Sequence, residues 1–321
     1  MATVLVVSER DDLHATVLAH VLERDYGARV LRTDLRDFPG SRGSVRVGHG
    51  GVRRVLGDVE PDGVDAVWWR RAHPTDPSGD DEFAAYRQVE CDAFVQGALW
   101  SLDARWVNDP GAERVASRKI VQLGAAVAAG LAVPETLVTS DPAEAEAWIA
   151  ARPGEVVFKR TGASRTAFFS ETRLVRPADL ARLSSIRSSP TTFQDFVEPV
   201  CDLRVIWVDG HFWTARIDSA AGAGRVDSRL DLSVDVTAVS LDAAVQAALN
   251  RLLRGLGLLF GVVDLRLGRN GVHHFLEVNP QGQFADVEIR TGLPVFRSLA
   301  GLLAIGDAEC VPDAAVRSAA G

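Results

Sequence analysis

Apolar residues recur along the chain with two different periods, and the period distinguishes predicted strands from predicted helices. Residues 3–7 form a short valine-rich run, which is typical of a buried strand. Leu13, Val17 and Val21 then recur every fourth residue, as on the inner face of a helix over residues 11–24. This alternation predicts an open α/β domain at the N-terminus. Its other predicted elements are strands at 29–31 and 66–71, a hairpin over 44–55 and a helix over 81–102.

Two further units of mixed strands and helices follow in the sequence. The pattern of the second unit predicts a helix over 113–129, a strand at 135–138, a helix that begins at Asp141 and a strand at 155–159. The pattern of the third predicts strands at 192–197, 203–208 and 212–217, a loop over 218–240, a helix over 240–256 and strands at 260–267 and 272–278. We therefore expect three domains, which comprise residues 1–105, 106–193 and 194–321.

Oxygen-bearing side chains gather in the last predicted hairpin. Asn270-Gly271 is a dipeptide typical of a type I′ turn, and a two-residue turn there places Asp264 opposite Glu277. Directly paired residues point to the same face of a sheet, and Asn279 shares that face because it lies two residues beyond Glu277. Two carboxylates held together without a counter-charge cost several kcal/mol when they are partly buried.

A divalent cation would remove that cost. Magnesium prefers carboxylate oxygens and completes its coordination with water and phosphate, so we predict a magnesium site at Asp264, Glu277 and Asn279. The alternative is a hairpin with an ordinary polar outer face, which the flanking apolar residues disfavour. His273 and His274 are adjacent and point to opposite faces, so they are not expected to act as joint ligands.

Candidate nucleotide-binding groups precede the hairpin. Lys159 ends an apolar strand and Lys119 lies on the predicted helix 113–129; a lysine at either place can reach a phosphate, although each could also be a solvated surface charge. The small-residue loop 161–166 could offer backbone N–H groups to phosphates. Residues 194–197, QDFV, are suited to pair with an adenine edge. Arg204, with Arg216 and Arg229 as alternatives, could stabilise a developing acyl phosphate.

Composition and charge narrow the class of protein. Hydrophobic residues make up 47% of the 321 residues, which is ordinary for a globular chain with a core. The formal net charge of -8 disfavours nucleic acid or an anionic membrane as a partner. Three cysteines without metal-ligand spacing indicate reduced thiols. The N-terminus has neither a basic region nor a long apolar run, so a cytoplasmic location is expected.

Read together in chain order, these motifs resemble the ATP-grasp superfamily. The motifs are Lys119, Lys159, QDFV (Gln194, Asp195, Phe196 and Val197), DLR (202–204), Asp264 and ExN (277–279). The resemblance implies an ATP-grasp fold, α/β and α+β in class, preceded by a pre-ATP-grasp domain. It implies that both lysines bind the phosphates of ATP, that 194–197 contacts adenine and that Asp202 holds the ribose. It further implies that Asp264, Glu277 and Asn279 carry Mg²⁺ and that Arg204 stabilises the acyl phosphate.

A narrower resemblance covers nearly the whole chain. The segments VWWRRAHP (67–74), WVNDP (106–110), LAVPETLVTSDP (131–142), ARIDS (215–219), VDSR (226–229) and FLEVNPQGQF (275–284) look like those of graspetide synthetases, the microviridin-type peptide maturases. The likeness implies a ribosomal precursor peptide, leader plus core, as the substrate. It implies ω-ester or ω-amide links between side chains, and a homodimer by analogy. RimK-type ligases share much of the pattern, but EVNPQGQF departs from their usual ending.

The implied chemistry leaves several roles open. Arg204 and Arg229 are the candidates to stabilise the oxyanion, and Asp227 is a candidate general base that could equally have a structural role. The aromatic residues Trp207, Phe212 and Trp213 either pack in the core or contact a leader peptide. Two rival functions remain: an ATP-grasp ligase for small amino acids or a protein C-terminus (RimK-like), and a nucleotide-binding regulator without catalysis.

Overall fold

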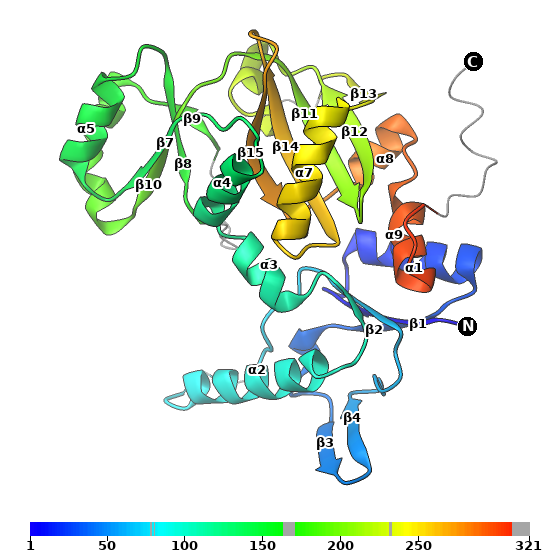
Figure 1. Cartoon of the computed structure of the whole chain (residues 1–321). Helices are drawn as coiled ribbons and strands as arrows, with labels where there is room; N and C mark the ends of the chain where they lie inside the picture. Colours follow the sequence, from blue (N-terminus) through cyan, green and yellow to red (C-terminus); the bar gives the residue numbers. More distant parts are fainter. Residues whose placement is uncertain (78, 80, 163–170, 231–232, 310–321) are drawn as a thin grey trace, which may run out of the picture.

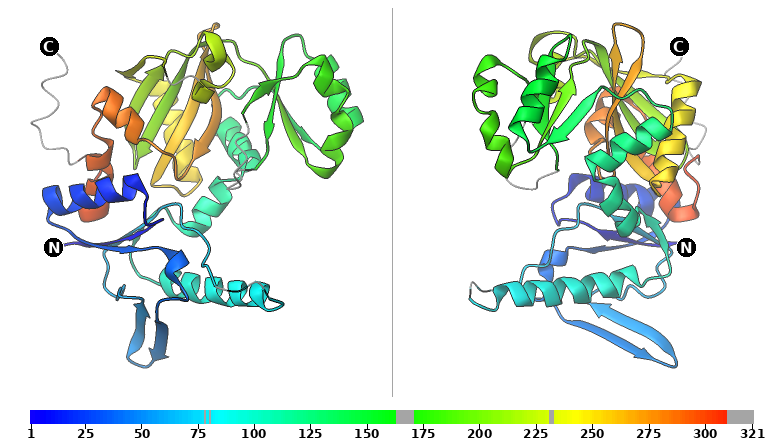
Figure 2. Two further views of the ribbon diagram at one scale, coloured as in Figure 1. Left: turned by 180° about the vertical axis from the view of Figure 1, so that it is seen from behind. Right: turned by 60° about the vertical axis from the view of Figure 1, so that its left-hand side comes forward.

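The structure, a computed structural model, contains three larger sheets covered by helices and a separate two-stranded hairpin (Figure 1). It describes the chain except for residues 78, 80, 163–170, 231–232 and 310–321. The second unit stands to one side of the third, and the N-terminal domain lies below both in Figure 1; the rotated views of Figure 2 agree. No helix in the described ranges is long and apolar enough to cross a membrane.

The N-terminal sheet is parallel and buried on both faces. Its strands run in the order β2-β1-β5-β6, with α1 packed on one face and α2 on the other. Val4 and Val6 face α1, whereas Leu5 and Val7 face α2, because successive side chains of a strand point to opposite faces. The elements of this domain are β1 (Thr3–Val7), α1 (Leu13–Tyr26), β2 (Arg29–Thr33), the short helix η1 (Leu35–Asp37), β5 (Ala66–Trp69), α2 (Ala84–Trp100), β6 (Arg105–Val107) and the hairpin β3 (Gly43–Gly48) and β4 (Gly51–Leu56).

The second sheet is antiparallel and small. Its strands run in the order β7-β10-β8-β9, and its core contains Ala145, Val156 and Phe193. The elements are β7 (Thr136–Thr139), α5 (Pro142–Ala150), β8 (Val156–Arg160), β9 (Arg173–Leu174), α6 (Pro177–Leu180), η2 (Leu183–Ser188) and β10 (Thr191–Asp195).

The third sheet is also antiparallel and forms the centre of the molecule. Its strands run in the order β13-β12-β11-β14-β15. α7 and α4 pack on one face, and α9 packs on the other, where it also contacts α1 of the N-terminal domain. The elements are α3 (Pro110–Ala116), α4 (Lys119–Ala128), β11 (Pro199–Val208), β12 (His211–Ile217), η3 (Gly222–Arg225), η4 (Ser228–Leu230), β13 (Val236–Val239), α7 (Ala243–Gly255), β14 (Phe260–Gly268), β15 (His273–Asn279), α8 (Ala285–Thr291) and α9 (Val295–Ile305).

The predicted helix over 113–129 is two helices, α3 and α4. The hydroxyl of Ser117 donates to the carbonyl of Glu113 at 2.5 Å, and Arg118 leaves the helical conformation. Lys119 therefore becomes the first residue of a new helix, α4. Both helices pack on the third sheet, through Ala116 and Ala126 among others. The region 218–240, predicted as loop, contains the edge strand β13.

Sheet limits lie close to the expected domain boundaries. β6 of the first sheet ends at Val107 and β10 of the second ends at Asp195. The division into domains at residues 105 and 193 stays a prediction.

The register of the last hairpin agrees with the prediction for a reason that the prediction missed. Asp264 does pair with Glu277. The turn, however, is a three-residue loop: Gly268 pairs with Val272, and of the turn residues 269–271 only Gly271 has a positive φ (75°). A β-bulge between Asp264 and Leu265 then shifts the register by one residue and restores the expected pair.

Candidate active site

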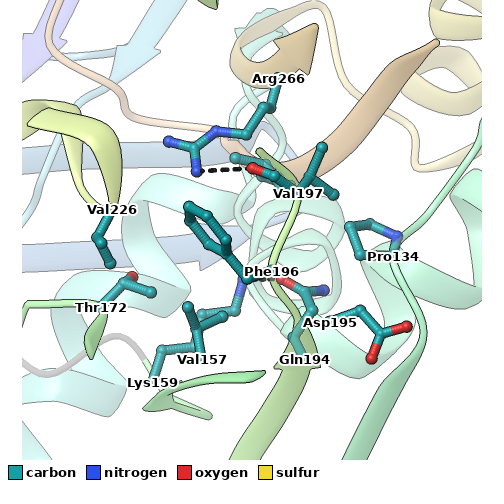
Figure 3. Close-up of a pocket in the computed structure, with 11 residues that line it drawn as sticks. Pro134, Val157, Lys159, Thr172, Gln194, Asp195, Phe196, Val197, Val226 and Arg266 are labelled. Atoms are coloured by element: carbon teal, nitrogen blue, oxygen red, sulfur yellow. Dashed lines mark hydrogen bonds between the residues drawn. The ribbon is translucent and has the colours of Figure 1, made fainter. Parts of the chain in front are cut away.

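A cleft lies where the second sheet meets the third, and Figure 3 shows its lining residues. Phe196 stands near its centre, with Arg266 on one side and Lys159 on the other. β8, β10 and the segment after β10 form one wall, while Arg266 from β14 and Leu276 from β15 contribute from the third sheet. The lining residues are Pro134, Val157, Lys159, Thr172, Gln194, Asp195, Phe196, Val197, Val226, Arg266 and Leu276.

The lysine of this cleft is held by a buried glutamine. Lys159 Nζ donates to Gln194 Oε1 at 2.9 Å, and Gln194 Nε2 donates to Thr136 Oγ1 at 2.8 Å. Burial, together with the positive charge of Lys119, lowers the pKa of Lys159 to about 8, while Glu277 and Asp264 oppose that shift. Gln194, predicted as a nucleotide contact, thus orients the lysine in this structure.

Two cross-strand pairs bring arginine and aspartate together on one face of the third sheet. Arg204 of β11 pairs with Asp264 of β14. Two residues along each strand, Asp202 of β11 pairs with Arg266 of β14, so the acidic residue is on β14 in the first pair and on β11 in the second. Arg204 Nη1 donates to Asp264 Oδ1 at 2.8 Å. Arg266 donates to both oxygens of Asp202, at 2.7 and 2.9 Å.

Both predicted carboxylate ligands of the metal already have a cationic partner. Lys119 Nζ lies 2.7 Å from Glu277 Oε2, and Arg204 holds Asp264. The expectation of two carboxylates without a counter-charge is therefore wrong. Lys119 reaches Glu277 because α4 begins at that lysine and lies against β15.

Burial raises the pKa of Asp264, because Arg204 offsets only part of that penalty and Glu277 adds to it. A further positive charge at this place would therefore be favourable. The third predicted ligand, Asn279, is exposed at the end of β15, and its Oδ1 accepts the N–H of Gln281 at 2.9 Å. Two carboxylates and an amide oxygen on one edge suit a hard cation such as Mg²⁺.

Asp202, predicted to hold the ribose, is buried against Arg266. The side chains of Asp202 and Arg266 are 8% and 7% exposed, respectively. Arg266 also donates to the carbonyl of Val197 at 3.4 Å and lies 5.7 Å from the centroid of the Phe196 ring. The sequence analysis missed Arg266, although its position two residues after Asp264 places both on one face of β14.

The segment predicted to contact adenine uses part of its backbone within the protein. The N–H groups of Asp195 and Phe196 donate to the carbonyls of Glu135 and Glu155, at 2.9 and 2.8 Å. A guanidinium, that of Arg225, lies 4.6 Å from the centroid of the Phe196 ring.

The proposed base Asp227 is buried and accepts the N–H of Thr172 at 3.1 Å. It follows Val226, which lines the cleft. The backbone of Arg229 lies in η4, but its side chain is outside the described part of the chain. Part of the predicted phosphate loop 161–166 also lies outside the described residues.

The aromatic side chains of the β11–β12 hairpin contribute to packing. Trp207 is fully buried in the core beneath α7, while Phe212 and Trp213 are partly buried against the two faces of the sheet. The core interpretation is therefore correct for Trp207. Asp209 and Gly210 both have positive φ, at 40° and 104°, so this Asp-Gly dipeptide forms the tight turn between β11 and β12.

Gln122, another residue that the sequence analysis missed, fixes α4 to the strand that carries Glu277. Its Oε1 accepts the N–H of Val278 at 3.1 Å, and its Nε2 donates to the carbonyl of Val278 at 2.7 Å. Gln122 could have been found from the sequence, because it lies three residues after Lys119 and therefore on the same face of a helix, one turn further on.

The chain resembles solved structures over nearly its whole length. An ATP-grasp ligase associated with ribosomal peptides from Chryseobacterium gregarium, in complex with ADP and a leader and core peptide, matches with a TM-score of 0.85 and 23% identity, over 94% of this chain and 96% of that one. The macrocyclase MdnC of Microcystis aeruginosa, bound with precursor peptide MdnA, matches with a TM-score of 0.82 and 26% identity, over 94% and 99% of the chains. MdnB of the same organism matches with a TM-score of 0.77 and 26% identity, over 95% and 100%.

These similarities confirm the ATP-grasp fold and the expected likeness to peptide-maturing ATP-grasp ligases. A more distant match, the D-cycloserine synthetase DcsG, has a TM-score of 0.57 and 20% identity, over 88% of this chain and 92% of that one. No family model and no curated protein matches the chain.

Proposed function

We propose that the chain is an ATP- and Mg²⁺-dependent ligase that joins a peptide Asp or Glu side chain to a hydroxyl or amine side chain of the same ribosomal precursor peptide. The observation that carries the proposal is the grouping of five charged side chains beside the cleft that Lys159 lines. They are Lys119, Lys159, Arg204, Asp264 and Glu277, which come from five different elements. Two structures that match 94% of the chain support the proposal, since one is an ATP-grasp ligase in complex with a leader and core peptide and the other is a macrocyclase bound with its precursor peptide.

The proposed reaction begins with attack of the substrate carboxylate on the γ-phosphate of ATP, which yields an acyl phosphate and ADP. Mg²⁺ supplies charge neutralisation for the phosphates. Asp264, Glu277 and Asn279 would hold the metal, and Lys119 and Lys159 would bind the phosphates. Arg204 would stabilise the acyl phosphate and the oxyanion that forms when a hydroxyl or amine attacks it. That attack releases phosphate and forms the ester or amide.

The proposed roles of the remaining residues follow from where they lie. The N–H of Val197 is the backbone group of the QDFV segment that we assign to the adenine edge, because the carbonyl of Val197 accepts from Arg266. Phe196 would lie beside the adenine ring, with Gln194 and Asp195 behind it. For Asp227, buried against Thr172, a general-base role requires movement, so we assign it a structural role here. Asp202 would reach a ribose only if it left Arg266. Arg229 keeps its proposed role as a second oxyanion-stabilising arginine.

The proposed substrate is a precursor peptide with a leader and a core. A cytoplasmic location is part of the proposal, because both ATP and a newly made ribosomal peptide are available there. The RimK-like alternative predicts a condensed product from free amino acids, and the regulator alternative predicts ATP binding without turnover. The ion pairs at Asp264 and Glu277 favour neither alternative.

The homodimer in the proposal has a suitable surface on α2. Tyr86, Val89, Ala93, Gly97 and Trp100 lie exposed along one side of this helix. These residues are spaced symmetrically about Ala93: Val89 and Gly97 are each four residues from it, and Tyr86 and Trp100 are each seven residues from it. Two antiparallel copies related by a twofold axis would therefore place Tyr86 against Trp100 and Val89 against Gly97, as a self-complementary interface requires. A Cβ at Gly97 would meet no atom within 4 Å, so Val89 of a second copy has room.

A charge on α2 and one on the neighbouring helix α3 also match in this arrangement. Arg114 lies 5.7 Å from the ring centroid of Trp100, while Glu90 lies one turn from Tyr86. The twofold axis that pairs Tyr86 with Trp100 brings Arg114 of one copy toward Glu90 of the other. Opposite charges across such an interface favour this partner and this register.

The experiment that tests the proposed function is incubation of the protein with ATP, Mg²⁺ and the peptide encoded beside its gene. Mass spectrometry should show the loss of one water for each link formed, together with release of ADP. Consumption of ATP on free amino acids alone would favour the RimK-like alternative. Binding of ATP without turnover on any carboxylate would favour the regulator.

A further inference from the structure

The segment between β15 and α8, together with the first residue of α8, has most of its backbone N–H and C=O groups held by side chains. We call residues 281–285 the 281–285 loop. It begins two residues beyond Asn279, the last of the proposed metal ligands. Backbone N–H and C=O groups in a protein interior need partners. Here the partners come from the N-terminal domain on one side and from the proposed active site on the other.

Arg70 supplies the contacts from the end of β5. Its Nη1 donates to the carbonyls of Gln281 and Gly282, at 3.0 and 3.2 Å. Its Nε donates to Asp12 Oδ2 at 3.2 Å, and the side chain is only 1% exposed. A buried guanidinium held by a carboxylate at one end is a rigid donor, so it determines where these two carbonyls lie.

His14 of α1 holds the next two backbone groups. The N–H groups of Phe284 and Ala285 both donate to His14 Nε2, at 3.0 and 3.1 Å. Burial, together with the positive charge of Arg70, lowers the pKa of His14 to about 4. The ring is therefore neutral at pH 7, and Nε2 carries the lone pair that both donors need.

The proposed active site contacts the same loop between these two anchors. Arg204 Nη2 donates to the carbonyl of Gln283 at 2.8 Å, while its Nη1 binds Asp264. Asn279 Oδ1 accepts the N–H of Gln281 at 2.9 Å. Gly282 lies so close to β14 that a Cβ there would be 2.4 Å from the Cβ of Val262. The loop therefore has little freedom to move without displacing Arg204 and Asn279.

We infer that Arg70 and His14 are positioning residues, through which the N-terminal domain sets the place of Arg204 and Asn279. This inference rests on the proposed function and adds a role for the N-terminal domain in it. Neither residue reaches the cleft, so each acts only through the 281–285 loop. Misplacement of a reacting group by about 1 Å can cost a factor of about 100 in rate. A merely structural contact between domains would instead change stability and leave the site's response to Mg²⁺ unaltered.

The test compares Arg70→Met and His14→Leu with two further variants of the full-length protein. Arg54→Met is the matched control, because Arg54 is a buried arginine of the same domain that bonds to Asp62 and Ser101, away from the loop. His14→Gln is the conservative variant, because an amide oxygen can still accept from Phe284 and Ala285. The readouts are calorimetric binding of ADP at a series of Mg²⁺ concentrations, and turnover of the precursor peptide.

We expect Arg70→Met and His14→Leu to need more Mg²⁺ for half-maximal ADP binding and to lower kcat by about 10- to 100-fold. His14→Gln should recover most of both, and Arg54→Met should lose thermal stability without either change. Wild-type Mg²⁺ dependence and kcat in the folded Arg70→Met and His14→Leu proteins would overturn the inference and leave the proposed function standing. If Arg70→Met does not fold, the comparison of His14→Leu with His14→Gln tests the inference by the same two measurements. Failure of the wild-type protein to bind ADP at any Mg²⁺ concentration would remove the proposed function, and this inference with it.

Discussion

Lys119 Nζ lies 2.7 Å from Glu277 Oε2, so a lysine proposed to bind phosphate neutralises a carboxylate proposed to bind Mg²⁺. Arg204 stands in the same relation to Asp264, at 2.8 Å. Each of the two carboxylates proposed to bind Mg²⁺ is thus paired with a cationic side chain of the protein. Binding of Mg²⁺ and ATP would exchange the partners of these side chains, because the carboxylates would bind the metal and the lysine would bind the phosphates. That exchange would leave Lys119 and Glu277 each with a partner of opposite charge at both stages.

Glu277→Gln should abolish turnover and leave the fold intact. The amide has the same shape as the carboxylate but neither its charge nor its strength as a metal ligand. Peptide mass spectrometry measures turnover, and circular dichroism with thermal unfolding monitors the fold. Glu60→Gln is the control, since it removes a carboxylate from an exposed ion pair with Arg53 outside the cleft. Normal activity of Glu277→Gln would exclude Glu277 as a metal ligand.

Affinity for ATP should decrease as the pH rises through about 8. Lys159 has its pKa lowered to about 8, so it is charged below that pH and loses its proton above it. The attraction between the ammonium and a phosphate is then lost, so the affinity falls by up to about tenfold per pH unit. Calorimetric titration of ADP between about pH 7 and about pH 9 measures the effect. Lys159→Arg should flatten the profile, because arginine stays charged; the same slope in both proteins would contradict the assignment.

Asp202→Asn should destabilise the protein, because it leaves Arg266 buried without a counter-charge. Loss of one partner from a buried ion pair costs about 3–5 kcal/mol, and both side chains are over nine-tenths buried. Urea unfolding measures the free energy of unfolding. The double variant Asp202→Leu with Arg266→Met should regain most of it, since an apolar pair needs no compensation. A variant of normal stability that no longer distinguishes ATP from 2′-deoxy-ATP would instead favour the ribose role of Asp202.

The stability of the protein should fall in acid partly through His14. Its pKa drops from 6.5 to about 4 on folding, mainly by burial and the charge of Arg70, with a smaller effect of Arg71 in the same direction and opposition from Asp12 and Asp286. The unfolded chain therefore binds the proton more tightly. Stability from the neutral ring is fully present above about pH 6.5 and is lost as the pH falls toward about 4, by at most roughly 3 kcal/mol.

Comparison with His14→Gln isolates this contribution from that of the carboxylates, which also titrate in that range. The wild-type protein should lose more stability than His14→Gln between about pH 6.5 and about pH 4. Parallel curves for the two proteins would show that the imidazole does not titrate differently in the folded and unfolded states.

Val89→Glu should convert the proposed dimer to a monomer. Val89 is 64% exposed on α2, and a charge there would be buried against Gly97 of the second copy in the proposed dimer. Val127→Glu is the control, since Val127 is 63% exposed on another helix, α4. Sedimentation velocity measures the mass of each variant. A wild-type monomer, or a dimer that survives Val89→Glu, would remove α2 as the interface.

Local patterns predicted most elements because short-range chemistry controls them. The Asp-Gly turn at residues 209 and 210 and the strands on either side agree with the sequence. Helix 113–129 was less predictable. Its periodicity is continuous, and the break at Ser117 depends on a hydroxyl bond to Glu113 and on packing against β15. Lys119 is aimed at Glu277 only because of that break.

The sequence alone determined the oxygen and nitrogen groups of the proposed site and their order, because motif spacing and strand alternation are local properties. It also led to the correct partner for Asp264, but only through two errors of one residue that cancel: a longer turn and an unforeseen bulge. Tertiary structure decided which charges neutralise one another, as Lys119 with Glu277 and Asp202 with Arg266. It also decided that His14 and Arg70 reach the 281–285 loop, more than two hundred residues away in the chain. Such contacts depend on how whole sheets and helices pack, and no local pattern encodes that packing.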